Sequence, residues 1–143
     1  MMYSAKNIAE YVVDYCNRQG NPVSNLKLQK ILYFLWVDYY KQTKTELFPE
    51  KFAAWQFGPV VPDIYYEFCE YGGLPITENF AVQLDDHDRN LINSIIEHYL
   101  PKTARELVSM THQENTPWYT VYKNGEGARH PIPTELIIKK LEA

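Results

Sequence analysis

Apolar side chains recur at helical spacing along most of the chain, and the longest such run lies between residues 28 and 39. Ser24 or Asn25 is suited to cap the start of this run. The spacing predicts a long central helix, with polar side chains on its other face that packing does not require. The apolar stripe consists of Leu28, Ile31, Leu32, Leu35, Trp36 and Tyr39, and the polar face of Lys27, Gln29, Lys30, Asp38 and Lys41.

Shorter helices are predicted on both sides of the central one. Ser4 precedes an apolar stripe at positions 8, 11, 12 and 15, and Gly20 ends that helix. A third helix begins at Pro62 and ends at Gly72. A fourth helix is predicted over residues 86–99, and a short fifth helix begins at the capping-box sequence of residues 103–106. A short helical turn is predicted around residues 118–122, and a last helix begins at residue 133.

A small β element completes the predicted fold. Residues 53–57 are short, aromatic and bounded by proline and glycine, which indicates an extended segment. Residues 80–84 are expected to form a second short strand that pairs with it. The predicted fold class is therefore mainly α: a single compact domain over residues 1–143, with about six helices around a long central helix.

Composition adds three limits to this picture. Aromatic residues make up 15% of the chain, and its Tyr residues suit either a core with hydroxyls at the surface or a protein interface. The net charge of −4, with Lys and Arg scattered, argues against nucleic acid as the main ligand. Two cysteines far apart and no signal-peptide core or apolar span predict a cytoplasmic protein with reduced thiols and no membrane partner.

Motifs for catalysis or cofactor binding are missing from the sequence. The four histidines lack metal-site spacing, and the glycines build no phosphate-binding loop, so we expect no metal and no cofactor. Cys16 and Cys69 follow aromatic residues in predicted helices and look like packing residues. A hydrolase that uses Cys69 or His112 stays open as an alternative, but no catalytic residue is predicted.

Several segments together resemble the Panacea domain, the family of SocA-like and GepA-like phage-associated proteins. The resemblance runs in order over nearly the whole chain. We call the matching segments the signature segments: residues 25–34 (NLKLQKILYF), 54–65 (AWQFGPVVPDIY), 71–72 (YG), 111–114 (THQE) and Trp118. Any one of these segments alone would be weak evidence for the family, but the five together are specific for it.

The resemblance implies a non-catalytic antitoxin that neutralises a cognate protein toxin by direct contact. One branch of the family delivers its toxin to a ClpXP-type protease, so a proteolytic adaptor is the alternative. The family motif marks ten positions as partner-binding candidates: Lys27, Gln29, Lys30, Tyr33, Trp55, Gly58, Pro59, Tyr65, His112 and Trp118. For Lys27, Gln29 and Lys30 two interpretations stay open: they face the partner, or they brace the central helix against the Gly58 loop.

Overall fold

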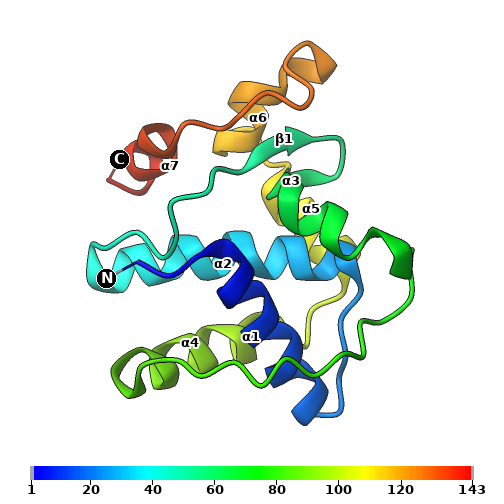
Figure 1. The fold of residues 1–143 in the computed structure, drawn as a ribbon. Helices are drawn as coiled ribbons and strands as arrows, with labels where there is room; N and C mark the ends of the chain where they lie inside the picture. The colour runs from blue at the N-terminus through cyan, green and yellow to red at the C-terminus, as the bar shows by residue number, and fades with distance from the viewer. Residues whose placement is uncertain (1, 143) are drawn as a thin grey trace.

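The computed structural model describes residues 2–142, and within them the protein is mainly helical with one small sheet (Figure 1). This confirms the predicted fold class. The α-helices are α1 (Ala5–Arg18), α2 (Asn25–Thr43), α3 (Pro62–Glu67), α4 (Asp86–Tyr99), α5 (Ala104–Thr111), α6 (Pro117–Tyr122) and α7 (Thr134–Glu142). Two 3₁₀ turns, η1 (Cys69–Tyr71) and η2 (Lys123–Gly125), and two strands, β1 (Ala53–Trp55) and β2 (Gly58–Val60), complete the fold.

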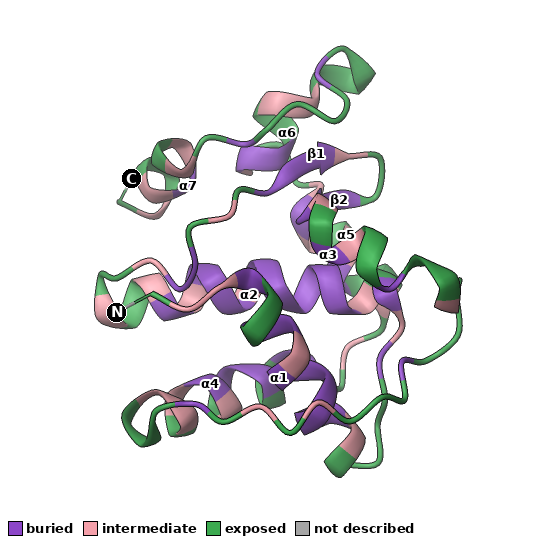
Figure 2. Cartoon of the chain, in the orientation of Figure 1, coloured by how far each residue is buried: buried purple, intermediate pink, exposed green. Residues whose placement is uncertain are grey.

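Helix α2 is the centre of the molecule, as its long apolar pattern predicts. It crosses the middle of the fold, with α1 and α4 on one side and the β hairpin, α3 and α5 on the other (Figure 1). Most of its length is buried (Figure 2). A helix that contacts other elements on two sides must bury polar side chains as well as its apolar stripe, and this decides where the signature residues of α2 lie.

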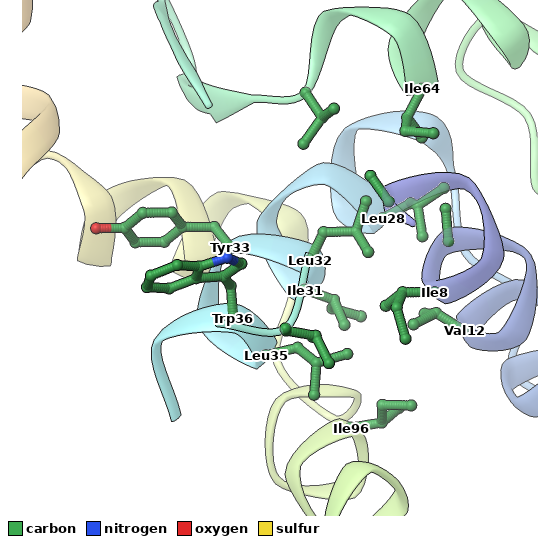
Figure 3. Close-up of a cluster of buried hydrophobic side chains, with 14 of the residues drawn as sticks. Ile8, Val12, Leu28, Ile31, Leu32, Tyr33, Leu35, Trp36, Ile64 and Ile96 are labelled. Carbon is green, nitrogen blue, oxygen red and sulfur yellow. The ribbon is translucent and has the colours of Figure 1, made fainter. Parts of the chain in front are cut away.

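Side chains from α1 and α4 fill the space beneath α2 (Figure 3). Ile8 and Val12 of α1 meet Leu28 and Ile31 of α2, and Ile96 of α4 closes the cluster. All five residues have no exposed surface. Complete burial of an aliphatic side chain contributes about 1.5–3 kcal/mol, so this layer supplies much of the stability of the fold.

Three of the predicted helix starts are confirmed by their caps. The Ser4 hydroxyl accepts a hydrogen bond from the Asn7 N–H at 3.1 Å, and the Ser24 hydroxyl accepts one from the Lys27 N–H at 3.3 Å. Thr103 and Glu106 form the reciprocal capping box at the start of α5. Each cap satisfies an amide that has no partner within its helix, and such a cap is worth about 1 kcal/mol.

Tyrosine hydroxyls tie α4 to α2 and to the segment before α1. Tyr3 and Tyr39 both donate to the Asp88 carboxylate, at 2.7 and 2.8 Å, and Tyr99 donates to Asp38 at 2.5 Å. The pKa of Tyr39 is raised to about 12, mainly because the hydroxyl is buried and in second place because it donates to Asp88. These tyrosines are therefore packed in the protein, with their hydroxyls on carboxylates near the surface.

The second predicted strand, at residues 80–84, is wrong. β1 pairs instead with β2, in the register Ala53↔Val60 and Trp55↔Gly58. Residues 80–82 wrap around a buried carboxylate: Asp14 accepts hydrogen bonds from the N–H groups of Phe80 and Val82, at 2.7 and 3.0 Å. Ala81 between them has a φ of 53°, which no strand residue adopts, so the carboxylate takes the place of a strand partner.

Candidate functional site

Most of the signature segments, far apart in the sequence, meet above the N-terminal half of α2. Residues 71–72 are not part of this cluster, because Tyr71 packs on Phe68 and donates to Glu78. The β hairpin lies on this part of the helix, α5 contacts both α2 and β2, and α6 contacts β1. The loop that precedes α7 also joins this cluster. Ala54 of β1 donates its N–H to the His130 carbonyl at 2.8 Å, and the Arg129 N–H donates to the Ala54 carbonyl at 2.6 Å. The site therefore has a buried inner cluster and an outer groove.

Lys30 is at the centre of the inner cluster and has no exposed surface. Its ammonium donates to the Pro59 carbonyl at 2.7 Å. Burial lowers its pKa from 10.5 to about 7, since no carboxylate among residues 2–142 forms an ion pair with it. Lys30 is thus a long donor that reaches from the helix to the hairpin.

Gln29 makes the second link between α2 and the hairpin. Its amide oxygen accepts from the Val61 N–H at 3.0 Å, and its Nε2 donates to Asn25 at 3.2 Å. Lys30 and Gln29 together satisfy backbone groups of the β2 segment that no strand covers. Unpaired groups at a strand edge invite another chain to pair, and here the helix occupies them.

The polar face predicted for the central helix is therefore not a solvent face at this end. Gln29 and Lys30 are fully buried, and Lys27 is half-buried with its ammonium on the Leu100 carbonyl at 2.6 Å. Their burial follows from the length of the side chains, which carry a polar end across apolar surroundings to a backbone group. The contacts of Gln29 and Lys30 are those expected if these residues brace the central helix against the Gly58 loop.

Gly58 is the point of closest approach in the cluster. Its φ of 111° is one that other residues rarely adopt. A Cβ here would lie 2.6 Å from the Thr111 hydroxyl and 3.0 Å from the Lys30 Cε. The position therefore requires glycine for two independent reasons.

His112 and Trp118 form a stacked pair at the end of α5. Their ring centroids are 3.8 Å apart and their planes differ by 1°. The Trp118 indole donates to the Trp55 carbonyl at 2.7 Å, which joins the pair to the hairpin. The His112 Nε2 is buried without a hydrogen-bond partner in the described part of the chain. The pKa of His112 is lowered, mainly by burial and in second place by the charge of Lys30.

A groove of about 390 Å³ opens on the outer side of the cluster. Trp55 and Tyr65 pack against each other in it, with centroids 4.9 Å apart and planes tilted by 59°, and the Arg129 guanidinium lies 4.0 Å from the Trp55 ring centre. Phe57, at the tip of the hairpin, is 55% exposed. The groove is lined by Leu26, Gln29, Trp55, Gln56, Phe57, Val60, Tyr65, Tyr122, Ala128 and Arg129.

The structure divides the ten sequence-predicted site residues between interior and groove. Trp55 and Tyr65 line the groove, and Gln29 reaches it from below. Tyr33 packs edge-on against Phe52 in the core. Lys30, Gly58, Pro59 and Trp118 are buried in the inner cluster, while His112 and Lys27 are half-buried. Whether these residues contact a partner stays a prediction.

Sequence reasoning missed two prominent groove residues. Phe57 is inside a signature segment, but a hydrophobic run gives no sign of which members face outward. Arg129 lies in the loop between α6 and α7, and no local sequence pattern marks it. Its place depends on the hydrogen bonds that lay residues 129–132 along β1, where Pro131 also forms a bridge with Ala53.

The cysteines lie outside the groove. Cys16 is completely buried on α1, and burial raises its thiol pKa to about 12, so the reactive thiolate is disfavoured. Cys69 is exposed on η1, which corrects the expectation that it packs in a helix. Within residues 2–142, no three His, Cys, Asp or Glu side chains gather to hold a metal ion. The helices of this same stretch are all too short or too polar to cross a membrane.

Comparison with known proteins agrees with this grouping of residues. The profile of a family described as "Antitoxin SocA-like, Panacea domain" matches residues 28–119, which hold most of the signature segments. A relative from Caulobacter vibrioides (strain NA1000 / CB15N), "Antitoxin SocA", is 31% identical over 137 residues, covering 86% of this chain and 72% of the relative. No solved structure matches the chain. The chain belongs to the SocA-like antitoxin family, whose members carry the Panacea domain.

Proposed function

We propose that this protein is an antitoxin that neutralises a cognate protein toxin by direct binding in the cytoplasm. The observation that carries the proposal is family membership, together with the similarity to "Antitoxin SocA" over most of the chain. The proposed role is non-catalytic: the groove is lined by aromatic, aliphatic and amide side chains and one arginine, with neither thiol among them.

The form of the site supports binding to a protein. Tyr, Trp and Arg are enriched among the residues that contribute most to protein interfaces, and Trp55, Tyr65 and Arg129 lie together in one groove. The inner cluster fixes the hairpin that carries Trp55. A fixed surface loses little conformational entropy on binding, which favours affinity. We therefore assign the buried signature residues to shaping the groove and the exposed ones to contact.

The test is co-expression with the product of the adjacent gene. We expect that product to stop growth alone, that growth returns when this protein is present, and that the two co-purify. Absence of any association between the purified proteins at micromolar concentration would contradict the proposal. A Cys69→Ala variant should neutralise as well as the wild type, because an exposed thiol outside the groove has no part in binding.

The same experiment in a host without ClpXP-type protease separates masking from delivery. If masking suffices, growth returns in both hosts. If the protein is an adaptor, growth returns only where the protease is present, and the toxin level falls when this protein is expressed.

A further inference from the structure

Arg129 is held in an unusual conformation at the mouth of the groove. Its φ of 68° lies in the left-handed region, which a residue with a side chain adopts at a cost of about 1 kcal/mol. The backbone hydrogen bonds on both sides of it, from Arg129 to Ala54 and from Ala54 to His130, hold it there. Strained residues persist where the surrounding structure fixes them, and they gather at functional sites.

The guanidinium of Arg129 is stacked on Trp55 but has no counter-ion among residues 2–142. It lies 4.0 Å from the Trp55 ring centre, and no carboxylate of residues 2–142 lies within 4.0 Å of it. It is the single charged residue among those that line the groove. On a chain with a net charge of −4, the groove thus presents an isolated positive group beside an aromatic wall.

Exposed apolar surface is concentrated around this arginine. Leu26 and Phe57 line the groove and are 37% and 55% exposed, and Tyr66, 56% exposed, packs on Trp55 with centroids 6.0 Å apart. Half of the large exposed hydrophobic side chains of the described chain therefore lie in or next to one groove. Single exposed apolar residues are ordinary, but a cluster of them marks an interaction surface.

We propose that the groove receives a segment of the toxin that carries an Asp or Glu side chain beside an apolar one. The carboxylate pairs with the Arg129 guanidinium, whose planar fork suits bidentate binding, and the apolar side chain packs between Trp55 and Phe57. The stacking of Arg129 on Trp55 orders the guanidinium before the toxin arrives. This inference rests on the proposed function and names the chemistry of the surface that the toxin presents.

The test measures toxin affinity for two groove variants, each with a matched control. Arg129→Gln removes the charge and Phe57→Ala removes the apolar contact; we expect each to raise the Kd at least about tenfold, as for interface hot spots. Arg105→Gln and Leu74→Ala make the same changes at exposed positions outside the groove, and their Kd should stay within about twofold of wild type. Circular dichroism verifies that all four variants fold.

A double-mutant cycle identifies the pairing. Surface Asp and Glu residues of the toxin are changed to Asn or Gln one at a time, against wild type and Arg129→Gln. We expect one of them to weaken binding to the wild type about tenfold and to have little further effect on the Arg129→Gln variant. Additive losses at every acidic position would overturn the pairing.

The outcomes separate the two proposals. Toxin binding that is unchanged in both Arg129→Gln and Phe57→Ala overturns the groove inference and leaves the antitoxin proposal standing. A wild-type protein that binds no toxin overturns both. Displacement of the toxin by a micromolar single-stranded oligonucleotide, dT10, at moderate salt would show a groove for stacked bases and would also overturn the inference.

Discussion

Lys30 carries a polar end through the protein interior to a single carbonyl. Its ammonium is fully buried, bonds Pro59, and belongs to a cluster with the half-buried His112. Burial penalises the charged form of both side chains, which lowers both pKa values. The residue that the helical pattern placed on a solvent face thus titrates near neutral pH inside the fold.

This position predicts that stability depends on pH. In the folded protein the pKa of Lys30 is about 7, against 10.5 in the unfolded chain. The unfolded state therefore binds one proton more between these values, so the free energy of unfolding rises with pH by up to about 1.4 kcal/mol per unit in that window. Below pH 7 both states hold the proton, and the full penalty of burying it is present. Chemical denaturation at pH 7, 8 and 9 measures the slope.

The matched variant is Lys30→Met, which keeps the unbranched side chain up to the position of Cε and removes the titrating group. We expect it to lose most of the difference between pH 7 and pH 9 that the wild type shows. An equal slope in the two proteins would assign the pH dependence to other groups.

At the scale of elements, the hairpin and α2 are fitted to one another. The turn places Gly58 of β2 against the helix. There Lys30 donates a hydrogen bond to the Pro59 carbonyl, and Gln29 accepts one from the Val61 N–H. Thr111 at the end of α5 closes the same contact. A two-stranded hairpin is marginal alone, so these tertiary contacts are what hold it in shape.

Gly58→Ala should therefore destabilise the protein by about 2–3 kcal/mol, because it adds a steric conflict with Thr111 and Lys30 to an unfavourable φ. Gly20→Ala is the matched control: its φ is also positive, at 70°, but nothing lies within 4 Å of the added Cβ. We expect it to cost only about 1 kcal/mol. Thermal and urea unfolding measure both; equal losses would show that the close approach at Gly58 is unimportant.

Across the whole molecule, α2 joins two regions with different roles. On one side, α1 and α4 form the aliphatic layer that stabilises the fold. On the other, the hairpin, α5 and α6 build the inner cluster and the groove (Figure 1). The single domain predicted for residues 1–143 stays a prediction, and one cooperative unfolding transition is its test.

A partner that binds only the folded state stabilises it by mass action. With free toxin at 100 times the Kd, we expect about 2.7 kcal/mol of added stability, which raises the Tm by about 5–10 °C for a chain of this size. Differential scanning fluorimetry at increasing toxin concentration measures the shift, with an unrelated protein at the same concentration as control. A Tm that does not respond to toxin would contradict direct binding.

Much of the local structure was determined by the sequence alone. The 3.6-residue spacing of apolar side chains, the Ser4, Ser24 and Thr103 caps and the Pro62 start are signals contained within a few residues, and the helices form where these signals predict. The ordered signature segments likewise identified the family. These features need no knowledge of distant contacts.

The tertiary structure decided what depends on contacts between distant residues. It buried Gln29 and Lys30, because their long side chains find backbone partners on the hairpin rather than water. It paired β1 with β2 instead of residues 80–84, where the Asp14 carboxylate satisfies the backbone. It also brought Arg129 onto Trp55, and with it the charge of the groove, since only the pairing of the last loop with β1 places that side chain there.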